Sequence, residues 1–155
     1  MGNQSKLFVS LKPENTGVLF NNHIEENDSI NILDEEYVFN GGGVLAADFD
    51  NNGLVDLFFT GNQVSNRLYL NKGNFQFEDI SSQAQIEAKK QWATGTTYAD
   101  INGDGYLDIY VCTAMYKGNR KNLLYINQGL QPDGALRFEE SAEAYGVADT
   151  GNSMG

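Results

Sequence analysis

The chain has a single cysteine among its 155 residues, and this absence of thiols limits what can hold it together. Cys112 alone excludes a disulfide within the chain and a zinc site built from thiolates. It lies in the apolar run DIYVC, which favours a buried position on a β-strand.

Basic residues are also scarce. The chain has 10 lysines and arginines against 21 aspartates and glutamates, a formal net charge of −11. Nucleic-acid phosphates require a basic face, so a nucleic-acid partner is not expected. No run is long and apolar enough to span a bilayer, and no signal peptide is visible. Part of the acidic excess is regularly spaced, which indicates cation binding in addition to a solvated surface.

The usual catalytic patterns are absent as well. The one histidine, His23, has polar neighbours, which indicates a surface position. The patterns H-E-x-x-H and G-x-S-x-G and the P-loop do not occur. We therefore predict a non-catalytic chain. The alternative is a fragment of an enzyme whose catalytic residues lie outside this chain.

The abundant residues are glycine and aromatics, with 17 Gly, 8 Tyr and 9 Phe, and they belong to an internal repeat. The acidic loop DFDNNGLVD at 48–56 recurs 52 residues later as DINGDGYLD at 100–108. Each loop is followed by a short apolar run, LFFTG or IYVCT, rich in β-branched and aromatic residues. The pair of loops therefore marks the start of two equivalent units.

The equivalence continues beyond the loops. NRLYLNKG at 66–73 resembles NLLYINQG at 122–129, and FEDIS at 77–81 resembles FEESA at 138–142. The lengths differ only between these segments, as expected if the segments are strands and the gaps are hairpin loops. Four antiparallel strands in 50–60 residues are typical of one propeller blade. We predict an all-β fold of such blades, forming part of a propeller.

The predicted division of the chain has four parts. An outer strand plus an irregular segment occupies 1–40, the blades occupy 41–94 and 95–148, and a third repeat starts at 149–155. KLFVSLKPENTGV, Lys6 to Val18, resembles the fourth-strand region of the first blade. Residues 19–40 fit neither repeat. They are expected to form either a short helix or an extended cover strand. Two blades cannot close a ring, so we expect a piece of a longer protein or a unit that assembles with copies of itself.

Both acidic loops follow D-x-[DN]-x-[DN]-G-x-x-D, an arrangement that suits a hard cation. Side chains at positions 1, 3 and 5 converge as the chain curls, and the glycine at position 6 permits the sharp turn. The backbone carbonyl at position 7 and the acid at position 9 then complete the set of oxygen ligands. We predict about two Ca²⁺ ions, one per loop, each stabilising the first hairpin of its blade. The predicted ligands are Asp48, Asp50, Asn52, Leu54, Asp56, Asp100, Asn102, Asp104, Tyr106 and Asp108.

Two other interpretations of these loops were weighed. An EF-hand requires a bidentate Glu at position 12 and flanking helices, but Phe59 and Val111 occupy that position within apolar β runs. A plain Asx-rich turn would need no cation. Two loops in register, each crowding three carboxylates that repel one another, favour cation binding. The expected affinity is that of an extracellular module, on the order of 10⁻⁴ to 10⁻³ M.

These loops and the segments after them resemble the FG-GAP/VCBS repeats of integrin-α-type β-propellers. They are most similar to bacterial exported proteins in which such repeats precede an ASPIC/UnbV domain. The resemblance covers Gly41 to about Val147 and, more weakly, Lys6 to Val18. It implies a calcium-binding, exported or cell-surface module that binds or adheres to a protein or carbohydrate. The Phe-Gly and Gly-Ala-Pro signatures are absent, so integrin-like ligand binding is not implied.

Two further features are candidate ligand contacts. Trp92 lies just before the second unit and favours packing between blades over a sugar platform. The stretch MYKGNRK carries Tyr116, Lys117, Arg120 and Lys121, a local basic region on an acidic chain. This stretch is either a solvated loop or a contact for a ligand.

Overall fold

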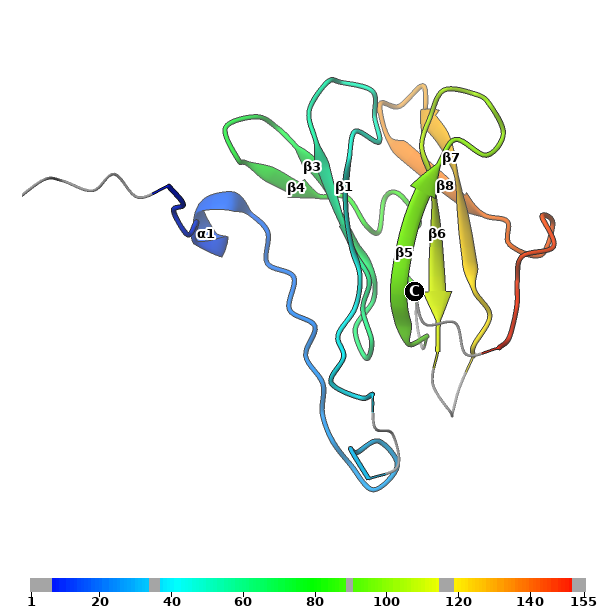
Figure 1. Ribbon diagram of the computed structural model, residues 1–155. Coiled ribbons are helices and arrows are strands. Elements are labelled where there is room, and N and C mark those ends of the chain that lie inside the picture. The colour runs from blue at the N-terminus through cyan, green and yellow to red at the C-terminus, as the bar shows by residue number, and fades with distance from the viewer. Residues whose placement is uncertain (1–6, 34–36, 89–90, 115–118, 152–155) are drawn as a thin grey trace, which may run out of the picture.

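The computed structural model of the protein describes residues 7–33, 37–88, 91–114 and 119–151. Figure 1 shows two upright β-sheets side by side, with the N-terminal part of the chain running along the outside of the first. The elements, in chain order, are α1 (Pro13–Thr16), β1 (Val44–Ala47), β2 (Asp56–Phe59), β3 (Arg67–Asn71), β4 (Phe77–Asp79), β5 (Ala93–Ala99), β6 (Asp108–Thr113), β7 (Leu123–Leu130) and β8 (Leu136–Glu140).

Each sheet contains four strands in sequence order, β1-β2-β3-β4 and β5-β6-β7-β8, and every pairing is antiparallel. The registers of the two sheets are equivalent, since Leu45 pairs with Phe58 in the first and Thr97 with Tyr110 in the second. Successive hairpins between short strands produce this meander. The predicted all-β fold of four-stranded antiparallel blades is confirmed.

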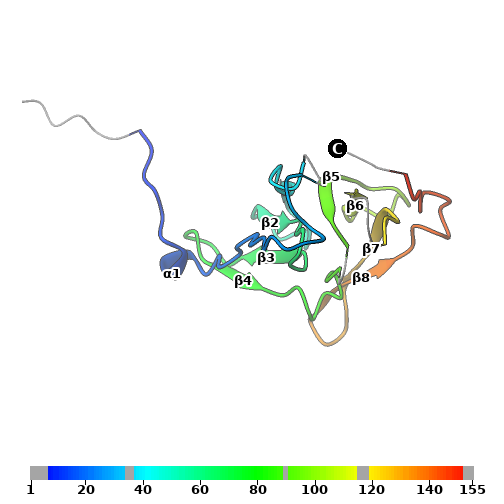
Figure 2. The same cartoon turned by 90° about the horizontal axis from the view of Figure 1, so that it is seen from below.

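The core lies between the two sheets, which Figure 2 shows from below. Along β2 the side chains alternate, so that Phe58 is buried in this core while Leu57 and Phe59 point to the other face. The second sheet supplies residues such as Ile109, Val111 and Phe138 to the same cluster. The two repeats therefore share one main core, and a smaller cluster around Leu124 and Ile126 lies apart from it.

An extended segment covers the far face of the first sheet. Phe20 stacks on Phe59, with ring centroids 5.0 Å apart. Asn22 and Asn62 exchange hydrogen bonds, and the side chain of Gln63 bonds the backbone of Glu25. Of the alternatives for residues 19–40, the described part is an extended cover segment, with one isolated bridge between Asn27 and Ile30.

The predicted outer strand at the N-terminus is wrong over the residues that the structure describes. No strand forms in 7–18, and α1 lies there instead. Pro13 begins the helix and Gly17, with φ of 80°, ends it in the left-handed conformation. A fourth strand needs a third strand of its own sheet for its hydrogen bonds, and none is beside these residues. Leu7 and Phe8 are accordingly exposed.

Strands β1 to β4 lie between residues 44 and 79, and strands β5 to β8 lie between residues 93 and 140. The division between 94 and 95 falls within β5, because that strand already begins at Ala93. At the C-terminal side, Asn122 donates a backbone hydrogen bond to the carbonyl of Asp149, at 3.0 Å. Residues 152–155, on which the predicted third repeat mainly depends, lie outside the described residues.

Most of the single-residue predictions agree with the structure. His23 is at the surface, 3.5 Å from the carboxylate of Glu25, and Trp92 is buried. Cys112 lies on β6 as predicted but is half-buried, and burial raises the pKa of its thiol. Tyr116 and Lys117 lie outside the described residues.

Candidate calcium-binding loops

The first acidic loop joins β1 to β2 and is held together by its own side chains. The carboxylate of Asp48 accepts hydrogen bonds from the backbone amides of Asn52 and Gly53, at 3.1 and 2.8 Å. Asn51 and Gly53 have positive φ values, 58° and 86°, which allow the sharp reversal. The sequence pattern D-x-D-x-N-G thus produces a curled loop with its oxygen atoms turned inward.

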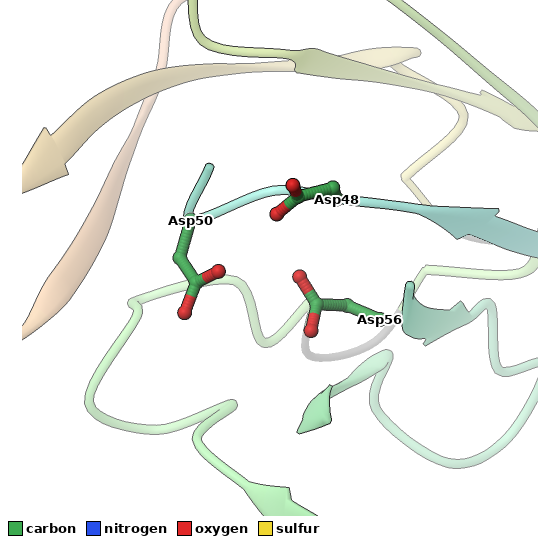
Figure 3. A group of neighbouring side chains, drawn as sticks. All are labelled: Asp48, Asp50 and Asp56. Atoms are coloured by element: carbon green, nitrogen blue, oxygen red, sulfur yellow. The ribbon is translucent and has the colours of Figure 1, made fainter. Parts of the chain in front are cut away.

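Three carboxylates converge in this loop. One oxygen from each of Asp48, Asp50 and Asp56 lies within 4.8 Å of the others. Figure 3 shows the three groups pointing toward one another around a common space. Burial raises the pKa of Asp56 from 3.8 to about 6, and the charges of Asp50 and Asp48 contribute to this rise. Burial also raises the pKa of Asp50. A bound cation would favour the ionised form of all three groups.

Asp56, the acid at position 9, is fully buried and has a second role. Its two oxygens accept backbone hydrogen bonds from Phe49, at 2.9 Å, and Asn71, at 2.8 Å. Phe49 lies at the start of the loop, whereas Asn71 is the last residue of β3. Asp56 therefore ties the loop to a third strand, which a ligand role alone would not require.

The second loop joins β5 to β6 and repeats this arrangement. Asp100 accepts hydrogen bonds from the backbone amides of Gly103 and Gly105, at 2.7 and 2.9 Å. Asp108 is fully buried and accepts from the amides of Ile101 and Asn127, both at 2.8 Å. The position-9 acids thus have equivalent partners in both loops. Both position-1 acids accept from the amides at positions 5 and 6, and Asp100 also accepts from Gly103 at position 4.

The loops differ at position 3, where Asp50 of the first loop corresponds to Asn102 of the second. Asn102 donates through its amide to the carboxylate of Asp104, at 2.8 Å. Within the ranges that the structure describes, the only close grouping of three acids is the one in the first loop. Position 5 shows the reverse exchange, Asn52 against Asp104, so each loop has three carboxylates, and those of the first loop lie closer together.

The remaining predicted ligands lie in the same two loops. The side-chain oxygens of Asn52 and Asp104 accept from the backbone amides of Leu54 and Tyr106, at 2.8 Å in both cases. Leu54 and Tyr106 directly follow Gly53 and Gly105, which have positive φ. Ligation through their carbonyl oxygens stays a prediction.

Sequence reasoning missed two residues that support the loops, Asn71 and Asn127. Besides the backbone bonds to the position-9 acids, their side chains accept from Gly73 and Gly129, both at 2.9 Å. Their amides donate to the loop carbonyls of Val55 and Leu107. Both residues begin an N-x-G pattern, NKG or NQG, and this pattern is the one sequence feature that marks them. By itself it predicts only an ordinary turn.

Two four-stranded antiparallel meanders, each with an acidic loop between its first two strands, define a chain of propeller-type repeats. Residues 37–111 match the FG-GAP-like repeat family. The matched range includes the whole first sheet, both acidic loops and the beginning of β6. This match agrees with the resemblance seen in the sequence motifs of the chain.

A curated relative is cartilage acidic protein 1 of Xenopus tropicalis. It is 29% identical to this chain over 102 residues, which is 66% of this chain and 15% of that protein. The chain therefore spans only a small part of the length of this relative. No helix in the described ranges is long and apolar enough to cross a membrane.

Proposed function

We propose that the chain is a calcium-binding β-propeller repeat module, non-catalytic, that serves protein or glycan recognition outside the cell. The observation that carries this proposal is the convergence of Asp48, Asp50 and Asp56 in the first loop. Three carboxylates so close together are mutually repulsive, and an ion of opposite charge offsets this repulsion.

The donor atoms favour calcium over other metals. Both loops offer carboxylate, amide and carbonyl oxygen, and neither offers sulfur or imidazole nitrogen. Hard cations prefer such ligands, and Ca²⁺ accepts irregular sets of six to eight oxygens more readily than Mg²⁺ does. Asp48 and Asp56 stand at the two ends of the first loop, so an ion between them would hold β1 and β2 in register.

The extracellular setting is supported by two sequence similarities. The FG-GAP-like match and the similarity to a cartilage protein both point to an extracellular family. An affinity on the order of 10⁻⁴ to 10⁻³ M would suit calcium levels outside cells rather than those in the cytosol. The proposed role of the loops is to stabilise the fold, so the loops do not themselves indicate a ligand. The recognition role is therefore proposed by analogy with this family.

The direct test is calorimetric titration of the chelator-treated chain with Ca²⁺, together with melting in calcium and in EDTA. We expect about two sites and a lower melting temperature in EDTA, because an ion that binds only the folded chain stabilises it by mass action. Titration with Mg²⁺ is the control and should give weaker binding. Identical melting curves in calcium and EDTA, with no heat of binding, would contradict the proposal.

A further inference from the structure

Phe49 connects the first acidic loop to the second sheet. It lies between the predicted ligands Asp48 and Asp50, yet it is fully buried in the core between the sheets. Its ring makes edge-to-face contacts with Tyr98 on β5 and Phe138 on β8, at centroid distances of 6.3 and 6.4 Å. Two neighbouring ligands of the loop are thus attached to a residue that the other sheet holds.

The backbone of Phe49 is fixed on both sides. Its amide donates to Asp56 of its own loop, at 2.9 Å, and its carbonyl accepts from the side chain of Asn127 on β7, at 2.8 Å. Asn127 is fully buried, and its own backbone amide donates to Asp108 of the second loop. One residue therefore contacts both the first loop and the position-9 acid of the second.

A second hydrogen bond joins the loops at the surface. The side-chain amide of Asn51 in the first loop donates to the carbonyl of Gly105 in the second loop, at 3.0 Å. Gly105 is the turn glycine at position 6, whose amide is bonded to Asp100. The first loop is thus linked to β7 by a buried hydrogen bond from Asn127 and directly to the second loop by an exposed one from Asn51.

From these contacts we infer that Asn127 is a positioning residue for the cation site of the opposite sheet, and that the two loops bind as a coupled pair. The inference rests on the proposed calcium binding. The first loop reaches its binding geometry only when the second sheet is docked against it. Because such coupling is reciprocal, calcium in the first loop would in turn stabilise the contact between the sheets.

Asn71 provides the matched comparison. It occupies the place in the first sheet that Asn127 occupies in the second, with the same turn and the same bond to a position-9 acid. Its side-chain amide donates within its own sheet, to Val55, at 2.8 Å. Replacing Asn71 should therefore affect one loop, whereas replacing Asn127 should affect both.

The first experiment measures calcium binding to the first loop alone. Asp104→Ala disables the second loop, and Asn127→Ala is then added. We expect affinity to fall on the order of tenfold, as for other residues that support metal ligands. The control is Asp133→Ala in the hairpin between β7 and β8. Asp133 accepts a hydrogen bond from the amide of Ala135 and pairs with Arg137, and no hydrogen bond joins it to Phe49. Unchanged calcium affinity in the folded Asn127→Ala chain would overturn the inference.

The second experiment needs no metal and separates this inference from the proposed function. Amide hydrogen exchange is measured in EDTA over residues 48–56 and 100–108. We expect Asn127→Ala to accelerate exchange in both loops, and Asn71→Ala only in the first. If the native chain binds no calcium, the proposed function fails, and this exchange pattern still decides whether the loops are coupled.

Asn51→Gly keeps the test decisive if Asn127→Ala does not fold. Asn51 is exposed and has a φ of 58°, which glycine adopts without strain. Losing its bond to Gly105 should accelerate exchange in the second loop about threefold to tenfold, the effect of one modest hydrogen bond. If neither substitution changes exchange in the loop of the other sheet, the coupling does not exist.

Discussion

Asp56 accepts a hydrogen bond from the backbone amide of Asn71, at 2.8 Å, and so joins the acidic loop to the end of β3. The equivalent bond between Asp108 and Asn127 has the same length. The position-9 acids are therefore part of the sheet as well as part of the candidate site. The acids at positions 1 and 3 lie only in the loops, and this distinction leads to the first prediction.

Replacing Asp56 should destabilise the chain even when calcium is absent. Asp56→Ala leaves the buried amide of Phe49 and the amide of Asn71 without their acceptor, at a cost of about 2–4 kcal/mol in the free energy of unfolding. Asp50→Ala is the control, and in EDTA it should change stability by less than about 1 kcal/mol, because it relieves repulsion as it removes hydrogen bonds. Urea unfolding of both variants in EDTA measures the difference. Equal losses would show that Asp56 has no special structural role.

The pKa of Asp56 predicts how stability depends on pH. Burial raises this pKa from 3.8 to about 6 in the folded chain, so the folded state holds the proton more tightly than the unfolded state. The part of the stability that comes from this bound proton should therefore be fully present below about pH 4 and be lost as pH rises through about 6. Melting in EDTA across this range, compared with Asp56→Asn, isolates the effect. In calcium, which requires the ionised acid, the stabilisation by the ion should grow over the same range. A difference between the two chains that does not vary with pH would contradict the prediction.

The two loops should differ in calcium affinity. Each loop has three aspartates, because Asp50 with Asn52 in the first loop corresponds to Asn102 with Asp104 in the second, but only the carboxylates of the first loop converge within 4.8 Å. Since carboxylates that already converge need less rearrangement to bind an ion, the chain with only its first loop intact, Asp104→Ala, should bind Ca²⁺ more tightly than the chain with only its second, Asp48→Ala. Calorimetry decides the order.

A reciprocal exchange tests the cause of that difference. Asn102→Asp should raise the calcium affinity of the second loop, and Asp50→Asn should lower that of the first. Each affinity is measured with the other loop disabled. If these changes leave the affinities as they were, charge at position 3 is not responsible.

Phe49 and Ile101 occupy equivalent loop positions but should tolerate truncation very differently. Phe49 is fully buried between the sheets, whereas Ile101 is 45% exposed. Phe49→Ala should cost about 3–5 kcal/mol of unfolding free energy, the usual range for a buried phenylalanine. Ile101→Ala should cost much less, since little surface returns to water. Urea unfolding of the two variants measures both values, and comparable losses would mean that Ile101 is covered in solution.

The parts of the fold that could be predicted are those that depend on the residue pattern within a short segment. The acids and glycines of the two loops recur in register, and the strands beside them carry β-branched and aromatic residues, so the four-stranded sheets followed from the sequence. The segment from Lys6 to Val18 has a similar local pattern, but Pro13 and Gly17 form a helical turn where no third strand offers hydrogen bonds. Strand formation depends on a partner, which local pattern does not reveal.

The contacts between the repeats were not predictable for a related reason. The side chain of Asn127 bonds the carbonyl of Phe49, 78 residues earlier. In the sequence, NQG indicates only a turn. Nothing in the sequence around Phe49, which stands between two aspartates, indicates that its side chain is buried. Only the packing of the two sheets brings them together.

The hydrogen bonds from Asn52 and Gly53 to Asp48, and from Gly103 and Gly105 to Asp100, have a consequence for how an ion would bind. They fix the carboxylates during folding, so the conformational entropy of ordering the loops is lost at that stage and not upon ion entry. Binding would then consist mainly of exchanging the water around the ion for protein oxygens, with little movement of the backbone. Such rigid loops would take up and release the ion quickly while the hairpins keep their shape.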